Sequence, residues 1–223
     1  MEVWAAELLQ PSEWTKAAVA LLPSSETDRK EREPEEVWRR RIAARAAVRI
    51  ALGRHTGLDP ASLRFRRSSA GKPELAGPAP AEAVQFSVSR SGELCLIAAS
   101  DAGPIGVDVE AIRPIARLEQ IASRFGPRDE AAILRARGAQ RLRAFYATWT
   151  RREACLKAAG TGLAGGLGAE AEEGWTVIGL DLGKHYAGAL AVPRMAPVGP
   201  ASIAPQQLPM KIPVDQHAHK APA

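Results

Sequence analysis

The chain has 223 residues, of which 46% are hydrophobic and 25% are charged. This composition is typical of an ordinary folded chain of one large domain or two small ones, and it excludes disorder throughout. The formal net charge is +5. Between Arg39 and Lys72, ten Lys and Arg residues stand against one acid, Asp59, so a block of +9 is joined to a remainder of −4. Such polarity predicts an anionic ligand or partner, which composition alone does not identify.

No stretch reaches the ~18 apolar residues of a membrane span, and acids at positions 2, 7 and 13 argue against a secretory signal. We therefore expect a cytoplasmic protein. Cys95 and Cys155 each lie in an apolar run, which predicts buried packing rather than a disulfide or a zinc site. The four histidines show no metal-ligand spacing, so any metal would need oxygen ligands.

The first predicted helix covers residues 35–52 and ends at Gly53. Its apolar side chains recur every four residues, at Trp38, Ile42, Ala46 and Ile50. Three arginines share that spacing beside the apolar stripe: Arg41, Arg45 and Arg49. Helical geometry lines their guanidinium groups along one edge, where they could meet a multiply charged anion. A solvated charged face is the alternative interpretation.

A hairpin is predicted next, from strands 84–88 and 93–99 joined by a turn at Ser89, Arg90, Ser91 and Gly92. A further strand covers Ile105 to Glu110, where Asp108 and Glu110 lie on the face opposite the apolar residues. Two carboxylates at this spacing suit Mg²⁺, which takes one or two protein carboxylates and fills its other positions with water and substrate phosphates. An exposed acidic pair on an edge strand would give the same pattern.

The second predicted helix covers residues 140–159. Trp149, Glu153 and Lys157 are four residues apart and share one face, so an acid and a base stand beside an aromatic ring. A solubilising surface pair is the alternative. Strands 175–182 and 185–192 follow as a closing hairpin. The irregular order of helices and strands favours the α+β class, and seven prolines in residues 193–223 predict a disordered tail.

Taken together, these segments resemble the broad-range 4′-phosphopantetheinyl transferases, which activate carrier proteins of polyketide and nonribosomal-peptide biosynthesis. The resemblance covers about residues 30–192 and rests on four motifs: Gly71 to Leu75 (GKPEL), Phe86 to Gly92 (FSVSRSG), Gly106 to Glu110 (GVDVE) and Phe145 to Leu163 (FYATWTRREACLKAAGTGL). Separated motifs in one order are far more specific than any one of them.

The resemblance implies two similar α+β subdomains, residues 1–104 and 105–192, related by a pseudo-twofold axis with a ligand cleft between them. It implies transfer of 4′-phosphopantetheine from coenzyme A to a serine of an apo acyl or peptidyl carrier protein, with release of adenosine 3′,5′-bisphosphate. Mg²⁺, or alternatively Mn²⁺, would be the metal. No nucleic acid or membrane takes part in that reaction, and a monomer suffices to build the cleft.

The family's residues carry over position by position. The metal ligands match Asp108, Glu110 and Glu153. Glu153 and Lys157 are the implied catalytic residues, Glu153 as the base for the serine proton. The coenzyme A contacts match Arg45, Lys72, Ser89, Arg90, Asp108 and Lys157.

Three positions depart from the family pattern. Arg90 replaces a histidine, Arg152 replaces a lysine, and Asp129, or its neighbour Glu130, stands where a glutamate is usual. Arg90 and Arg152 leave open a catalytically impaired homologue. A nucleic-acid-binding module is a further alternative, which the basic helix and Arg64 to Arg67 permit, although Phe65 is the one aromatic residue of the basic block available for base stacking.

Overall fold

The computed structural model of the chain describes residues 1–29, 31–69, 71–77, 83–162, 166–194 and 202–210. The elements of the first half, in chain order, are β1 (Glu2–Glu7), α1 (Ser12–Leu21), α2 (Ser24–Thr27), α3 (Glu35–Thr56), β2 (Arg64–Arg67), β3 (Pro73–Ala76), β4 (Gln85–Ser91) and β5 (Leu94–Ser100). Those of the second half are β6 (Gly106–Ala111), α4 (Leu118–Ala122), η2 (Ser123–Phe125), α5 (Pro127–Arg135), α6 (Gly138–Ala159), η4 (Ala169–Glu172), β7 (Trp175–Leu180), β8 (Tyr186–Pro193), β9 (Ser202–Ile203) and β10 (Gln206–Gln207). The α+β class is confirmed.

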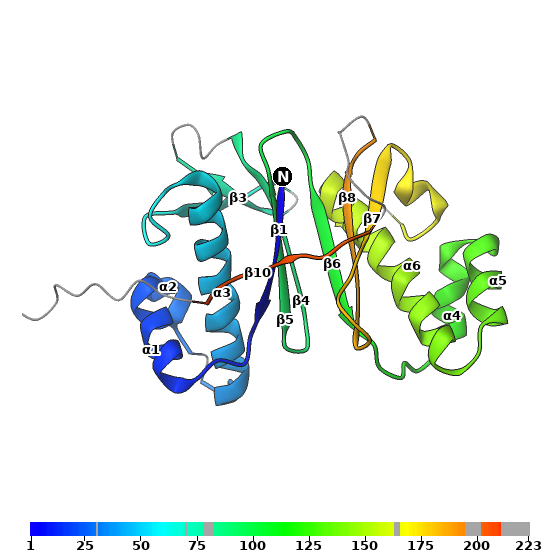
Figure 1. Ribbon diagram of the computed structural model, residues 1–223, viewed down its shortest axis with the longest axis horizontal. Coiled ribbons are helices and arrows are strands. Elements are labelled where there is room, and N and C mark those ends of the chain that lie inside the picture. The colour runs from blue at the N-terminus through cyan, green and yellow to red at the C-terminus, as the bar shows by residue number, and fades with distance from the viewer. Residues whose placement is uncertain (30, 70, 78–82, 163–165, 195–201, 211–223) are drawn as a thin grey trace, which may run out of the picture.

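Two four-stranded sheets form the centre of the molecule, and helices cover their outer sides (Figure 1). The first sheet has the order β10-β1-β5-β4, and the second has the order β6-β8-β7-β9. Alternate residues of each sheet, such as Val3, Leu96, Val107 and Leu190, share one buried cluster. Because strand side chains alternate between faces, the other faces are free to receive the helices. The molecule is therefore layered as helices, sheet, sheet, helices.

Each sheet is covered on its outer face by one long helix. In the first half, Ala47 and Ile50 of α3 pack on Trp4, Phe86 and Ile97 of the sheet. In the second half, a cluster of small residues lets α6 lie close to β8: Ala154, Cys155, Ala158, Ala189 and Ala191. Both cysteines are free and buried, as predicted, and burial raises the pKa of each thiol to about 12. None of the helices in the described ranges is both long and apolar enough to cross a membrane.

The two halves meet where β4 runs beside β6. Serine hydroxyls bridge these strands: the backbone N–H of Val107 donates to Ser87 Oγ at 3.1 Å, and that of Ala111 donates to Ser91 Oγ at 3.1 Å. The pairs advance in the same direction along both strands, so β4 and β6 run parallel along this seam. A line of hydroxyls thus ties one half to the other.

The C-terminal strands connect both sheets from the face seen in Figure 1. β9 pairs with β7 at Gly179 and Leu180, and β10 pairs in parallel with Trp4 and Ala5 of β1. Leu208 is buried in the first core, and its N–H donates to Ala5 O at 2.8 Å. The prediction of disorder after residue 192 is therefore wrong for residues 202–210, because main-chain pairing and one buried leucine order a proline-rich segment. Residues 195–201 and 211–223 lie outside the described part of the chain.

Several element boundaries differ from the prediction. The first long helix continues through Gly53 to Thr56 and ends at Gly57, whose left-handed φ of 73° forms the cap. Gly53 instead lies against Pro60, where a Cβ would be 2.8 Å from the proline ring. In the predicted hairpin, Ser89 and Arg90 belong to β4, and the reversal falls two residues later, at Gly92 and Glu93. The pseudo-twofold relation and the boundary at residues 104 and 105 stay predictions.

Candidate active site

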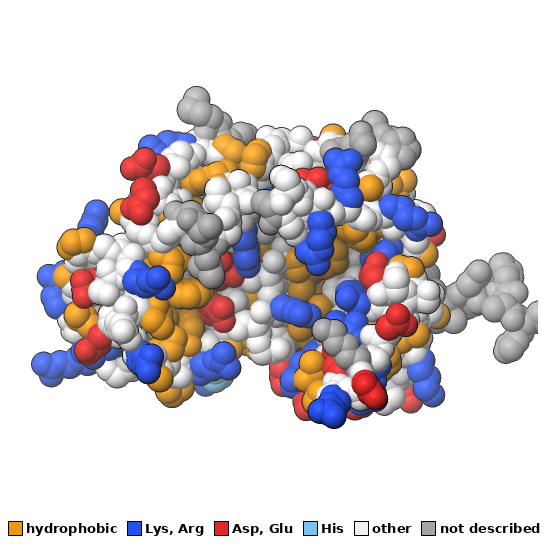
Figure 2. Space-filling model, turned by 180° about the vertical axis from the view of Figure 1, so that it is seen from behind, with side chains coloured by type: hydrophobic (Ala, Val, Ile, Leu, Met, Phe, Trp, Pro, Cys, Tyr) orange, Lys and Arg blue, Asp and Glu red, His pale blue; other side chains and the backbone are white. Residues whose placement is uncertain are grey.

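A cavity of about 670 Å³ opens between the two halves. Its walls come from α3, β2, β4, β6 and α6, with Glu26 and Pro73 contributing from neighbouring segments. Apolar side chains line the part formed by the first half: Ala44, Val48, Phe65, Phe86 and Val88. Charged side chains from both halves line the rest: Arg45, Arg67, Arg90, Asp108, Glu110, Glu153 and Lys157. Figure 2 shows this face of the molecule, hollowed between its halves, with acidic, basic and apolar side chains in the hollow.

Asp108 lies at the centre of the charged wall and is 3% exposed. Lys157 Nζ contacts its Oδ1 at 2.7 Å, and Ser89 Oγ donates to the same oxygen at 2.7 Å. Lys157 Nζ also donates to Ser89 Oγ at 2.9 Å. The other carboxylate oxygen, Oδ2, is buried and has no hydrogen-bond partner in the described chain. Because a buried polar atom is costly to leave unpaired, Oδ2 is available for a bound ligand.

Gly106 explains how the acid and the lysine come together. A Cβ at this position would lie 1.9 Å from Ala154 O and 2.5 Å from Ala158 N, so a glycine is needed for α6 to rest directly on β6. Val107 and Val109 are fully buried on the opposite face of the strand. This packing turns Asp108 toward the helix that carries Lys157, and it accounts for the glycine at the start of the GVDVE motif.

Three carboxyl groups face this cavity, and burial raises the pKa of each: Asp108, Glu110 and Glu153. Lys157 and Ser89 counter the rise at Asp108 by stabilising its charged form, and Ser91 does so at Glu110. At Glu153 the neighbouring charges of Asp108 and Glu110 add to the effect of burial. The three groups therefore repel one another electrostatically, and a cation between them would relieve that repulsion.

Among the described residues, no three His, Cys, Asp or Glu side chains are arranged to hold a metal ion as they stand. The predicted ligands Asp108, Glu110 and Glu153 line one cavity without forming such a cluster. Asp108 nevertheless fits a hard cation, because its unpaired Oδ2 is a buried oxygen of the kind that Mg²⁺ binds.

The predicted phosphate-binding cations divide between two cavities. Arg45 and Arg90 line the main cavity. Lys72 lines a neighbouring cavity of about 260 Å³, together with Lys157, which borders both. Burial lowers the pKa of Lys72, whose Nζ donates to Ile105 O at 3.3 Å. Arg67, which the sequence placed outside the matched motifs, is a further cation of the main cavity. The pairing of β2 with β3 brings it there, and no local sequence signal indicates that pairing.

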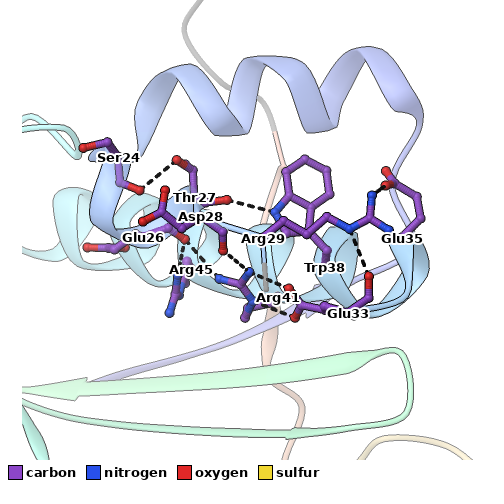
Figure 3. A network of polar contacts seen from close by, with 10 residues as sticks. All are labelled: Ser24, Glu26, Thr27, Asp28, Arg29, Glu33, Glu35, Trp38, Arg41 and Arg45. Atoms are coloured by element: carbon purple, nitrogen blue, oxygen red, sulfur yellow. Dashed lines mark hydrogen bonds and ion pairs between the residues drawn. The ribbon is translucent and has the colours of Figure 1, made fainter. Parts of the chain in front are cut away.

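The predicted row of three arginines on α3 does not act as a unit. Arg41 donates to Glu33 Oε2 at 2.8 Å and to the carbonyl of Asp28 at 2.6 Å, and Arg45 donates to the carbonyl of Glu26 (Figure 3). Arg49 is 2% exposed and donates to Glu26 Oε1 at 2.6 Å. The prediction that all three meet an anion is wrong for Arg41 and Arg49, which hold Glu26, Asp28, Glu33 and the loop after α3.

Arg152 and Asp129, two of the unusual positions, are partners of each other. Arg152 is 3% exposed and contacts Asp129 Oδ2 at 2.5 Å and Glu172 Oε1 at 2.7 Å. Arg151 contacts the same two acids at 3.5 Å and 3.0 Å. These four residues fasten α5 and η4 to the turn of α6 that carries Glu153. Neither Arg152 nor Asp129 lines the main cavity.

Comparison with known proteins identifies the family of the chain. The profile of the 4′-phosphopantetheinyl transferase superfamily matches residues 104–186, and that of the 4′-phosphopantetheinyl transferase N-terminal region matches residues 7–102. The 4′-phosphopantetheinyl transferase HetI of Nostoc sp. is 34% identical over 166 residues, which cover 74% of this chain and 70% of HetI. The chain belongs to the 4′-phosphopantetheinyl transferase superfamily.

Two further members of the superfamily are also similar to this chain. The phosphopantetheinyl transferase of Thraustochytrium sp. is 31% identical over 184 residues, which cover 75% of this chain and 63% of that protein. The 4′-phosphopantetheinyl transferase Sfp of Bacillus subtilis is 34% identical over 117 residues, 52% of this chain and 50% of Sfp. The profile of the superfamily takes in β6 and α6, which supply Asp108, Glu110, Glu153 and Lys157.

Proposed function

We propose that this protein transfers 4′-phosphopantetheine from coenzyme A to a serine hydroxyl of an apo acyl or peptidyl carrier protein. The observation that carries the proposal is the cavity between the halves, where Asp108, bonded to Lys157 and Ser89, keeps one oxygen free beside Glu110 and Glu153. Membership of the superfamily supports the same reaction. A cytoplasmic monomer that serves polyketide or nonribosomal-peptide carriers is part of the proposal.

Coenzyme A offers a pyrophosphate and a 3′-phosphate, and the cavity offers cations from both of its sides. In this proposal Arg45, Arg67 and Arg90 bind phosphate oxygens from the first half, and Lys157 binds the pyrophosphate from the second. Lys72 reaches the ligand from the neighbouring cavity, and Ser89 lines the main cavity between the two sets of cations. Arg90, in place of the histidine of the family pattern, offers a planar guanidinium with several N–H donors for a phosphate group.

Asp108, Glu110 and Glu153 would hold Mg²⁺, or alternatively Mn²⁺. When bound, the metal supplies charge neutralisation for the pyrophosphate. The chain's own residues position the reactants. The carrier serine oxygen attacks the β-phosphorus, the bond from that phosphorus to the bridging oxygen breaks, and adenosine 3′,5′-bisphosphate leaves. Glu153 accepts the serine proton, directly or through a water molecule, and Lys157 stabilises the charge that develops on the leaving phosphate.

The test is incubation of the protein with coenzyme A, Mg²⁺ and a panel of apo carrier proteins, followed by measurement of their intact masses. A gain equal to one phosphopantetheine on any carrier, absent without coenzyme A, is the expected result. A folded protein that modifies no carrier in a panel spanning fatty-acid, polyketide, nonribosomal-peptide and aminoadipate types would overturn the proposal.

A further inference from the structure

The line of serines along the seam does more than join the two halves. Ser87, Ser89 and Ser91 occupy every second position of β4, so their hydroxyls all point to the same side of the strand. Each hydroxyl accepts one hydrogen bond: Ser87 from the N–H of Val107 at 3.1 Å, Ser89 from Lys157 Nζ at 2.9 Å, and Ser91 from the N–H of Ala111 at 3.1 Å.

Two of the three hydroxyls also donate to an acid of β6. Ser89 Oγ donates to Asp108 Oδ1 at 2.7 Å, and Ser91 Oγ donates to Glu110 Oε2 at 2.7 Å. A hydroxyl has a single proton, and an N–H bonded to its oxygen turns that proton away from the N–H. The backbone of β6 therefore fixes the direction in which Ser91 donates.

The consequence is the same at both acids. One oxygen of each carboxylate accepts a hydrogen bond from a serine. The second oxygen of Asp108, Oδ2, is buried and has no hydrogen-bond partner in the described chain. At Glu110 the serine bonds Oε2, and among the described residues none donates to Oε1. Both acids line the cavity. Among the described residues, Ser87 differs from the other two, because its hydroxyl bonds only to a backbone N–H and to no carboxylate.

We infer that Ser91 is a positioning residue, which holds Glu110 Oε2 from across the seam so that Oε1 is presented to a divalent cation in the cavity. The inference rests on the proposed function, since the cation is the one that the transfer reaction would use. Ser91 lies outside the cavity lining. Ser89 has the same geometry at Asp108, but it lines the cavity, so its replacement would also disturb ligand binding directly.

A glutamate without this bond is free to rotate about its side-chain torsions, and ordering it then costs free energy when the cation binds. Partners that orient ligands of this kind typically contribute a factor of about 10 to 100 in metal affinity. A serine that only supported the fold would affect stability and leave metal affinity unchanged.

The test compares three variants with the wild-type protein. Ser91→Ala removes the donor to Glu110, Ser91→Thr keeps a hydroxyl, and Ser87→Ala is the matched control from the same strand. Binding of Mn²⁺ alone is measured by electron paramagnetic resonance, and the KM for coenzyme A is measured separately. We expect Ser91→Ala to weaken Mn²⁺ binding about tenfold, with Ser91→Thr and Ser87→Ala within about twofold of wild type. The KM for coenzyme A at saturating metal stays within about twofold in all three.

Two results would overturn the inference: an unchanged Mn²⁺ affinity in Ser91→Ala, or an equal loss in Ser87→Ala, which would indicate a general effect on the seam. Thermal unfolding of each variant, recorded in the same buffer, ensures that affinities are compared between folded proteins. Mn²⁺ binding by wild type without transfer to any carrier would instead remove the proposed function and leave the role of Ser91 in place. A wild-type protein that binds no Mn²⁺ would remove the role of Ser91.

Discussion

Helices α3 and α6 are each 22 residues long, and each covers the outer face of one of the two sheets. They border the same cavity from opposite sides, yet their charged side chains make different kinds of contact. On α3, Arg41 and Arg49 are bonded within their own half, to Glu26, Asp28 and Glu33 and to the loop after the helix. On α6, Lys157 contacts Asp108 of its own half and crosses the seam to Ser89, while Arg151 and Arg152 anchor the helix to Asp129 and Glu172.

The difference shows that a run of charge does not reveal its use. The basic block that dominates the sequence serves the architecture of the first half at Arg41 and Arg49, and only part of it, including Arg45 and Arg67, reaches the cavity. Helix α6 carries fewer charged residues, but one of them, Lys157, contacts Asp108 of β6 in the cavity. Replacements on the two helices should therefore separate effects on folding from effects on transfer.

The largest expected effect is on catalysis, at Asp108, the carboxylate that Lys157 of α6 contacts. Asp108→Asn keeps the shape of the side chain but removes the charge that faces Lys157 and that would hold the proposed metal. We expect the rate of transfer to fall about 100-fold or more. Intact-mass measurement of a carrier over time checks this value. Metal-dependent transfer at the wild-type rate would contradict the assignment of Asp108.

Arg49→Ala tests the architectural side of the comparison. It leaves the carboxylate of Glu26 and the carbonyls of Pro60 and Leu63 without their buried donor. We expect a loss of about 3 kcal/mol in the free energy of unfolding, measured by urea titration.

Arg45→Ala, from the same helix, should affect ligand binding more than stability. Its KM for coenzyme A should rise about tenfold with a smaller loss of stability, because Arg45 lines the cavity.

Gly106→Ala tests the close packing that places α6 on β6. The added methyl would overlap Ala154 O, so helix and strand must move apart. We expect a loss of about 2 kcal/mol in the free energy of unfolding, together with slower transfer because Lys157 shifts from Asp108. Gly179→Ala is the matched control, since in the described chain no heavy atom beyond its two neighbours lies within 4 Å of a Cβ there. Equal stability of the two variants would show that the contact at Gly106 relaxes without cost.

The smallest effect is expected at Arg152, where the family pattern has lysine. A lysine cannot reproduce both contacts of the planar guanidinium with Asp129 and Glu172. Arg152→Lys should cost about 1 kcal/mol of stability, observed as a lower Tm, with transfer kinetics near those of wild type. A large loss of transfer without a change in Tm would place Arg152 in the reaction, against its position outside the cavity.

Local pattern was sufficient for the part of the site that one strand or one helix carries. The alternation around Asp108 predicted β6 and its acidic face, and the four-residue spacing of Glu153 and Lys157 predicted a shared helical face. Contacts between different helices and strands could not be predicted from these local patterns. Glu153 and Lys157 read as a possible ion pair, whereas Lys157 contacts Asp108, 49 residues away. That contact depends on a long-range packing step at Gly106, which leaves no periodic signal.

The same limit explains the other departures from prediction. Ser89 and Arg90 have the composition of a turn, but pairing with β5 keeps them in a strand. Which arginines of α3 are buried depends on where Glu26, Asp28 and Pro60 fold back against the helix, and these are tertiary contacts. Residues 202–210 show no strand periodicity, because their two strands, β9 and β10, are each only two residues long. Each strand pairs at the edge of a sheet that other strands already form.

Those two short strands also bear on how the protein is produced. The matched segment of the superfamily profile ends at residue 186, at the start of β8, and before the strands that cover the edges of β1 and β7. A recombinant chain cut there would lose most of β8 and leave β1 with unpaired backbone groups along an apolar strand, which is a template for pairing with other chains. An expression boundary at residue 210 or beyond keeps these edges closed, and it also keeps the indole of Trp14 bonded to the carbonyl of Met210.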